Sequence, residues 1–224
     1  MIFIDKVKYG LFLVMSKTII LLFVFSSFAH ADNQIRILML GDSLTQGYGL
    51  EEKKGLVPKL QNWLSTNNVE VLLINGGVSG DTTLGGFERL DWLLTPNING
   101  VVVALGGNDL LRGFDPKFTK NNLQAIFKNL KSKGINSVIV GTISPINYGP
   151  QFKKEHDAIY PSLAREYNLS YIDSLFSPLI DKKTQEISVN LLQADGIHPN
   201  EKGVEAIVNY IGPVIKDFTD SLSQ

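Results

Sequence analysis

The sequence predicts an α/β fold of the flavodoxin-like type, a three-layer sandwich in which a five-stranded parallel sheet, in the order 2-1-3-4-5, has helices on both faces. Two patterns predict it. Short β-branched and aliphatic runs alternate with longer segments of helical periodicity, which is typical of strands joined by helical crossovers. Most of the short runs are uniformly apolar, as are strands covered on both faces. These patterns alone do not fix the order of the strands in the sheet, and we expect 2-1-3-4-5 because it suits five strands with right-handed crossovers.

The strand-like runs occur at five places along the chain. They are Ile35–Leu40, Val69–Ile74, Val101–Leu105, Ser137–Thr142 and Leu169–Ile172. The helical patterns fall between and after them. They are Leu56–Ser65, Thr83–Leu94, Thr119–Lys133, His156–Tyr167 and about Asn200–Phe218. Because no linker, repeat or low-complexity stretch separates these elements, the sequence predicts a single domain.

The composition excludes several classes of protein. A chain of 224 residues that is 44% hydrophobic and 19% charged is sufficient for one folded domain with a core. The formal net charge of −1 gives no basic excess for phosphate contacts, so nucleic acid is not an expected partner. The absence of cysteine excludes disulfides, thiolate metal sites, a cysteine nucleophile and a lipid-modified cysteine. A covalent nucleophile must therefore be an oxygen or an amine.

The first segment differs from the rest. We interpret residues 1–31 as a cleaved signal peptide and residues 32–224 as the mature domain. Lysines precede an apolar run, Thr18–Phe28, that is too short to span a bilayer comfortably, and the small-residue pattern Ala29-His30-Ala31 precedes the expected cut. An uncleaved anchor and a start at Met15 are the alternatives. The interpretation predicts a periplasmic or secreted protein without a stable membrane anchor. We also expect the protein to be a monomer.

Polar and glycine-rich residues follow the predicted strands. The first strand runs into Gly41-Asp42-Ser43, the second into Gly77-Val78-Ser79-Gly80 and the third into Gly106-Gly107-Asn108-Asp109, while Asp195 and His198 precede the last helix. Ligands of open α/β sheets bind beyond the carboxyl ends of the strands. We therefore expect these loops to share one edge of the sheet.

Acyl transfer to a serine needs an imidazole base and a carboxylate that orients it. Only His156 and His198 remain once the leader is removed. His156 lies among charged residues in a helical stretch, which favours a solvated surface histidine. His198 lies three residues after Asp195, a spacing that lets the carboxylate fold back onto Nδ1. The alternative is a helix-capping Asp195 with an exposed His198.

Two serines compete for the role of nucleophile. Ser43 is favoured, because a tight turn after the first strand presents its Oγ near a helix N-terminus. Ser79 is the rival, although its glycine-rich surroundings fit backbone donors better. Neither serine lies in the G-x-S-x-G elbow of the α/β-hydrolases.

The expected donors to an oxyanion are the Ser43 amide, the Gly80 amide and the Asn108 side chain. The alternatives are that Gly80 only serves a turn with a positive φ and that Asn108 only caps the segment that follows it. The acidic residues of these loops are expected to brace them rather than to catalyse. These residues are Asp42, Asp81 and Asp109. No H-E-x-x-H, P-loop or G-x-G-x-x-G motif is present, so the sequence predicts no metal and no cofactor.

The four loop motifs that contain Ser43, Gly80, Asn108 and His198, called the four blocks below, resemble those of the SGNH hydrolases of the GDSL family. The letters of that name fall on Ser43, Gly80, Asn108 and His198, in that order, and the similarity extends over nearly the whole mature chain. The resemblance implies a flavodoxin-like sheet, a Ser-Asp-His triad of Ser43, Asp195 and His198, and metal-free hydrolysis of esters and thioesters. Within the family, the bacterial periplasmic thioesterases, lysophospholipases and arylesterases are the most similar, so the expected substrate is a small-molecule or lipid acyl compound.

The apolar residues after Asn108 are candidates for contact with the acyl chain. Leu110, Leu111 and Phe114 lie between two glycines, and the resemblance implies that this loop covers bound acyl chains; Tyr148 lies in another similar segment. Ordinary core packing under the next helix is the alternative. A carbohydrate O-deacetylase on the same scaffold and a ligand-binding module without turnover are the other functions that we retain.

Overall fold

A computed structural model describes residues 34–144 and 146–223 of the chain. The predicted signal peptide and its cleavage site lie outside the described residues. Within the part that is described, no helix is both long enough and apolar enough to cross a membrane.

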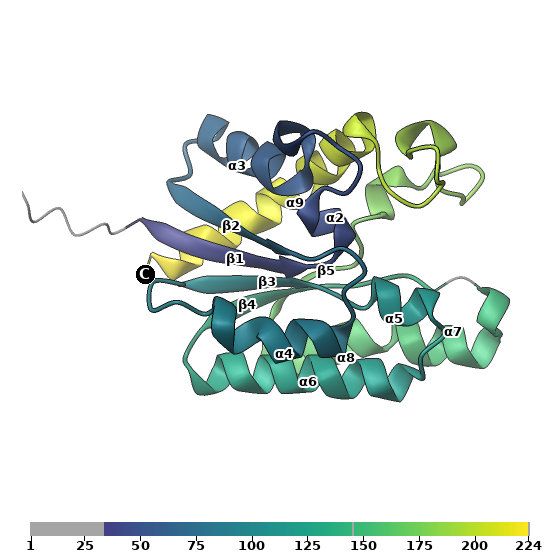
Figure 1. Ribbon diagram of the computed structural model, residues 1–224, viewed down its shortest axis with the longest axis horizontal. Coiled ribbons are helices and arrows are strands. Elements are labelled where there is room, and N and C mark those ends of the chain that lie inside the picture. Colours follow the sequence, from purple (N-terminus) through teal and green to yellow (C-terminus); the bar gives the residue numbers. More distant parts are fainter. Residues whose placement is uncertain (1–33, 145, 224) are drawn as a thin grey trace, which may run out of the picture. The chain divides into compact units, whose positions relative to one another are not determined.

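The described domain is built on one parallel sheet (Figure 1). Its strands are β1 (Ile35–Gly41), β2 (Val71–Gly77), β3 (Gly100–Ala104), β4 (Asn136–Val140) and β5 (Ser170–Ile172). Their order is β2-β1-β3-β4-β5, and every pair of neighbours is parallel. The predicted strand order is therefore confirmed.

Side chains alternate across the sheet and divide the core into two layers. From β1, Ile37 and Met39 belong to one apolar cluster, while Leu38 and Leu40 belong to the other. Figure 1 shows helices on both faces of the sheet. The first cluster includes residues of α3 (Leu56–Thr66) and α9 (Glu201–Leu222), and the second those of α4 (Thr83–Leu93), α6 (Pro116–Ser132) and α8 (Ile159–Tyr167). The predicted three-layer sandwich is confirmed.

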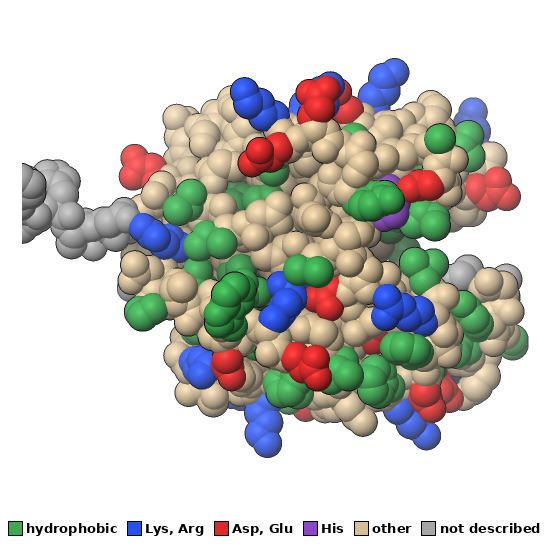
Figure 2. Space-filling model, viewed as in Figure 1, with side chains coloured by type: hydrophobic (Ala, Val, Ile, Leu, Met, Phe, Trp, Pro, Cys, Tyr) green, Lys and Arg blue, Asp and Glu red, His purple; other side chains and the backbone are tan. Residues whose placement is uncertain are grey.

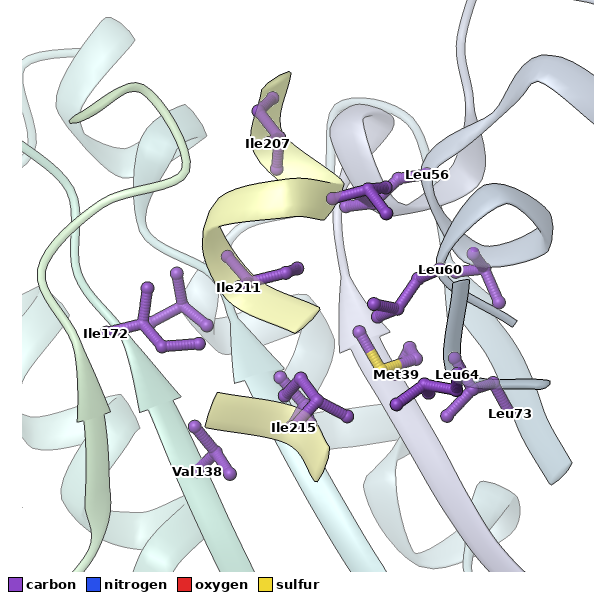
Figure 3. Packing of buried hydrophobic residues seen from close by; sticks show 14 of the residues in the cluster. Met39, Leu56, Leu60, Leu64, Leu73, Val138, Ile172, Ile207, Ile211 and Ile215 are labelled. Atoms are coloured by element: carbon purple, nitrogen blue, oxygen red, sulfur yellow. The ribbon is translucent and has the colours of Figure 1, made fainter. Parts of the chain in front are cut away.

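The last helix supplies much of the first layer. Ile207, Ile211 and Ile215 recur at four-residue intervals, so they share one face of α9. Figure 3 shows them between Leu60 of α3 and Ile172 of β5. All three are at most 1% exposed, so this face of α9 lies in the core.

The structure differs from the sequence prediction mainly at the ends of elements. β2 runs on through Gly77, because residues 75–77 pair with residues 39–41 of β1. A Cβ at Gly77 would lie 2.2 Å from the backbone nitrogen of Gln46, so only glycine permits this close approach. α6 begins three residues earlier than predicted, since Asp115 caps it and Pro116 occupies its first turn.

Two short helices were absent from the prediction. They are α2 (Ser43–Gln46) and α5 (Gly107–Leu111). The helix predicted over His156–Tyr167 starts earlier and is divided at Ala158 into α7 (Pro150–Asp157) and α8. α2 and α5 each begin directly beyond the carboxyl end of a strand, where the candidate residues Ser43 and Asn108 lie. They are too short for an apolar period to be recognised in the sequence.

We expect Gly212→Ala to destabilise the protein. Alanine normally stabilises a helix interior by about 0.5–1 kcal/mol relative to glycine. A Cβ at Gly212 of α9, however, would lie 2.7 Å from ring carbons of Trp63 of α3. We therefore expect the free energy of unfolding, measured with urea, to fall by about 1–3 kcal/mol. Asn209→Ala, at an exposed position of the same helix, should change it by less than about 0.5 kcal/mol. A more stable Gly212→Ala protein would contradict this packing of α3 on α9.

Candidate active site

A pocket of about 380 Å³ opens beyond the carboxyl ends of the strands. Figure 2 shows a notch in the surface at this edge of the domain. The pocket is lined by the loops that follow β1, β2, β3, β4 and β5 and by the loop before α9. The candidate residues in its lining are Ser43, Gly80, Asn108, Leu110, Leu111 and His198. The sequence-predicted meeting of these loops at one edge is thus observed.

Ser43 is the first residue of α2, immediately after β1. Asp42 caps this helix, and one of its carboxylate oxygens accepts a hydrogen bond from the Leu44 amide at 3.1 Å. The turn is tight, because a Cβ at Gly41 would lie 2.0 Å from Oγ1 of Thr45. This turn directs Ser43 Oγ toward the pocket, although the residue is only 9% exposed.

Ser43 Oγ lies 2.9 Å from His198 Nε2. His198 Nδ1 in turn lies 2.6 Å from Asp195 Oδ2. The other carboxylate oxygen of Asp195 accepts hydrogen bonds from the backbone amides of Ile197, at 2.9 Å, and His198, at 3.0 Å. The His198 amide, and then its ring, lower the pKa of Asp195 to about 2. A carboxylate that is ionised at neutral pH therefore holds the imidazole with Nε2 toward the serine.

The rival serine does not take part in this chain of contacts. Ser79 is exposed at the pocket mouth, where its backbone amide donates to Gln46 Oε1 at 2.9 Å. This bond ties the loop after β2 to α2. The geometry therefore favours Ser43 as the serine beside the imidazole.

Gly80 and Asn108 lie in the pocket lining together with Ser43. Asn108 Nδ2 donates to Asp42 Oδ2 at 3.2 Å, which fixes the orientation of the amide beside the nucleophile loop. Gly80 has a φ of +78° and its carbonyl accepts from Arg112 at 2.8 Å. Burial raises the pKa of Asp42 to about 6, against the opposing effect of its bonds with Leu44 and Asn108. Residues of two further loops thus lie in the same pocket lining as the serine.

The other two loop aspartates are bound within the protein. Asp81 accepts from Arg89 Nε at 2.7 Å. Asp109 is fully buried and accepts from the amide of Thr83, at 2.8 Å, and from its hydroxyl. These contacts fasten the loops after β2 and β3 to α4, as expected of bracing carboxylates.

The predicted acyl-contact residues fall into two groups. Leu110 and Leu111 line the pocket, the first buried and the second 60% exposed. Phe114 and Tyr148 are not part of the lining. Phe114 packs edge-to-face on Phe118, while the Tyr148 hydroxyl donates to the Leu111 carbonyl at 3.3 Å. These two aromatic residues therefore support the loop from outside the pocket.

Several lining residues were missed from the sequence. Tyr48 lies with its ring centroid 4.5 Å from that of His198. Ile143, Leu175, Phe176 and Ile197 complete the apolar walls. Ile197 lies within the Asp195–His198 turn, so its position in the sequence alone could have identified it. The others lie in loops whose path the sequence does not reveal.

The prediction that His156 is a solvated surface histidine is wrong. His156 is 0% exposed and its ring packs between Phe152 and Tyr160. Its Nε2 lies 3.3 Å from Oγ1 of Thr142, which lines the pocket. Burial lowers the pKa of His156. The charged sequence neighbours misled the prediction, because α7 ends at Asp157 and turns this one side chain inward.

Among the described residues, no group of three or more His, Asp or Glu side chains is placed to hold a metal ion.

Comparison with known proteins identifies the family. A model of the GDSL-like Lipase/Acylhydrolase family matches residues 39–206, three quarters of the chain and all four blocks. The chain belongs to this family. An arylesterase of Vibrio mimicus is 32% identical to this GDSL hydrolase over 197 residues, which are 87% of this chain and 94% of the relative.

A second curated relative is the thioesterase 1/protease 1/lysophospholipase L1 of Escherichia coli K12. It is 34% identical over 189 residues, 82% of this chain and 85% of the relative. Among solved structures, the psychrotrophic esterase EstA of Pseudoalteromonas sp. matches with a TM-score of 0.75 and 31% identity, over 83% of this chain and 98% of EstA. The GDSL hydrolase is accordingly a carboxylic ester hydrolase, and small-molecule esters fit it as substrates.

We expect His156 to make stability depend on pH. Because the pKa of the buried imidazole lies below its usual 6.5, the unfolded chain binds the proton more readily than the folded one. The contribution of neutral His156 is therefore present above pH 6.5 and is lost as the pH falls toward the lowered pKa. Urea unfolding of the native protein and His156→Gln between pH 8 and pH 5 measures this.

The stability advantage of the native protein over His156→Gln should shrink at acid pH. Other titrating groups, Asp42 among them, are common to both proteins and cancel in the difference. An advantage that stays constant over this range would show that His156 does not titrate with unfolding.

Proposed function

We propose that this GDSL hydrolase cleaves esters and thioesters through an acyl-serine intermediate at Ser43. His198 Nε2 accepts the proton of Ser43 Oγ as that oxygen attacks the acyl carbonyl, and then returns it to the leaving oxygen or sulfur. Asp195 keeps the imidazole in the required tautomer and stabilises the imidazolium. Water attacks the acyl-enzyme in a second cycle of the same transfers. The observation that carries this proposal is the Ser43–His198–Asp195 chain of 2.9 and 2.6 Å contacts at a pocket wall.

Negative charge develops on the carbonyl oxygen during both attacks. We assign the backbone amides of Ser43 and Gly80 and the side-chain amide of Asn108 as the donors that stabilise it. Asp42 supports this role, since its bond with one Nδ2 hydrogen leaves the other free to point toward the pocket. All of these groups are held before substrate arrives, which is what makes such donors effective.

The acyl chain is proposed to lie along the apolar side of the pocket. Leu110 and Leu111 form one wall, and Val140, Leu175 and Phe176 extend the pocket past the ends of β4 and β5. Burial of methylene groups against these side chains favours acyl groups longer than acetyl. The apolar lining therefore favours an esterase or thioesterase over a carbohydrate deacetylase.

We also propose that residues 1–31 direct export and are removed after Ala31, and that the mature domain acts as a periplasmic or secreted monomer. One chain supplies the whole proposed triad, which supports the monomer.

Ser43→Ala should abolish turnover while leaving the fold intact. We expect kcat/KM on a p-nitrophenyl ester to fall about a thousandfold or more, since triad members act as a unit. A fluorophosphonate should add one equivalent of mass to the native protein and to Ser79→Ala, but none to Ser43→Ala. The EstA structure, in which that esterase is inhibited by monoethylphosphonate, is a precedent for this reagent class. Labelling of Ser43→Ala, with its loss in Ser79→Ala, would move the nucleophile to Ser79. A ligand-binding module would not be labelled at all.

The dependence of rate on acyl length tests the pocket. On p-nitrophenyl esters from acetyl to medium chains, kcat/KM should rise by up to about fourfold per methylene, the equivalent of about 0.8 kcal/mol, until the pocket is full. Leu111→Ala should flatten this rise. Leu84→Ala, which removes an exposed leucine outside the lining, should not, and Phe114→Ala should have less effect than Leu111→Ala. A native preference for acetyl esters would favour the deacetylase instead.

The export proposal is tested by intact mass. The protein recovered from the periplasm or medium of an expressing bacterium should begin at Asp32. A membrane-bound form that retains Lys17 would show that the leader is an anchor.

A further inference from the structure

Arg89 lies on α4, away from the pocket lining, and joins two of the loops that build the site. Its Nε donates to Asp81 Oδ2 at 2.7 Å. One terminal nitrogen donates to the carbonyl of Gly76 at 2.7 Å, and the other donates to the carbonyl of Gly41 at 3.0 Å. The side chain is 20% exposed, and that of Asp81 is 11% exposed.

Each of the three acceptors has a defined place relative to the site. Gly41 ends β1, two residues before Ser43, and Gly76 lies in β2, next to its last residue. Asp81 directly follows Gly80. A single guanidinium therefore connects the backbone before the nucleophile with the loop that carries a proposed oxyanion donor.

The chemistry of the cluster requires arginine. The planar guanidinium presents donors in fixed, divergent directions, so one group can bind a carboxylate and two carbonyls of neighbouring strands at once. Lysine offers a single nitrogen on a flexible stem. The Gly41 carbonyl also accepts a hydrogen bond from the Val78 amide at 3.1 Å, so it contacts the loop after β2 as well as Arg89.

The distance between nucleophile and oxyanion donor matters to the rate. Gly80 is the proposed donor from the loop after β2, while Ser43 begins α2 directly after β1. The paired register of the two strands ends at Gly41 and Gly77, and the Val78–Gly41 bond is the last backbone link before Gly80. Removal of one oxyanion donor typically costs 10²–10³ in kcat, and a misplacement of about 1 Å can cost about 10². A link across the two loops thus controls a sensitive geometry.

We propose that Arg89 is a positioning residue that sets the Gly80 amide against Ser43 by holding Gly41, Gly76 and Asp81 together. The inference rests on the proposed function, since it needs Ser43 as the nucleophile. It adds a residue that touches no substrate and acts through the backbone of two loops.

The test uses Arg89→Met, which removes all three bonds, and Arg89→Lys, which keeps a cation for Asp81 but cannot reach both carbonyls. The matched control is Gln61→Met. Gln61 also joins a helix to β2, but near its amino end, where its side chain donates to the Val71 carbonyl at 2.9 Å and accepts from the Leu73 amide at 2.8 Å. The control therefore loses comparable bonds to the same strand far from the site.

We expect kcat on a short soluble ester to fall about 10- to 100-fold in both Arg89 variants, with KM changed less than about threefold. The rate of fluorophosphonate labelling should fall in parallel, because the phosphonyl oxygen needs the same donors. Arg89→Lys should recover part of the melting temperature lost in Arg89→Met without recovering kcat. Gln61→Met should lose stability but keep its kcat within about threefold.

Rates that follow melting temperature across all three variants would show a structural role only and overturn the proposal, as would an Arg89→Lys protein with native kcat. If Arg89→Met does not fold, Arg89→Lys alone decides between these outcomes. Failure of the serine mechanism is distinguished independently, because the native protein would then not be labelled at Ser43.

Discussion

The site depends on the parallel direction of all five strands. Parallel pairing brings every strand's carboxyl end to one edge, so each loop that leaves the sheet there can add a group to the same pocket. Ser43 follows β1, Gly80 follows β2 and Asn108 follows β3, while the Asp195–His198 turn enters from the segment before α9. The sheet gives these groups a common frame, which no local structure around any one of them provides.

Polar groups at this edge are buried, and the protein satisfies them from neighbouring loops. Asp42 binds Asn108, Asp109 binds Thr83, and Arg89 binds carbonyls of β1 and β2. A buried polar group without a partner costs about 1–3 kcal/mol, so each of these bonds also opposes displacement of its loop. The same hydrogen bonds therefore stabilise the fold and position the site. Glycines at the strand ends allow the backbones of neighbouring segments to approach closely enough for these bonds.

The two histidines show how far environment outweighs residue type. His198 lies at the pocket with its side chain 16% exposed, held by Asp195 and covered on one side by Tyr48. His156 is enclosed by aromatic rings, and burial lowers its pKa. The first is placed for proton transfer to Ser43. The second joins the packing behind Thr142 and supports the far wall of the pocket.

The sequence alone determined the succession of the five strands and the longer helices along the chain, because apolar periodicity is a local property. Short loop motifs likewise singled out Ser43, Asp195 and His198. The order of the strands in the sheet was expected from right-handed crossovers and the family resemblance, and the structure confirms it. Tertiary structure decided what depends on contacts between distant segments. His156 was misjudged because its charged neighbours in sequence are not its neighbours in space, and Phe114 lies outside the pocket because it packs on α6. Arg89 carries no motif, and its link between two strand ends exists only once α4 lies across the sheet.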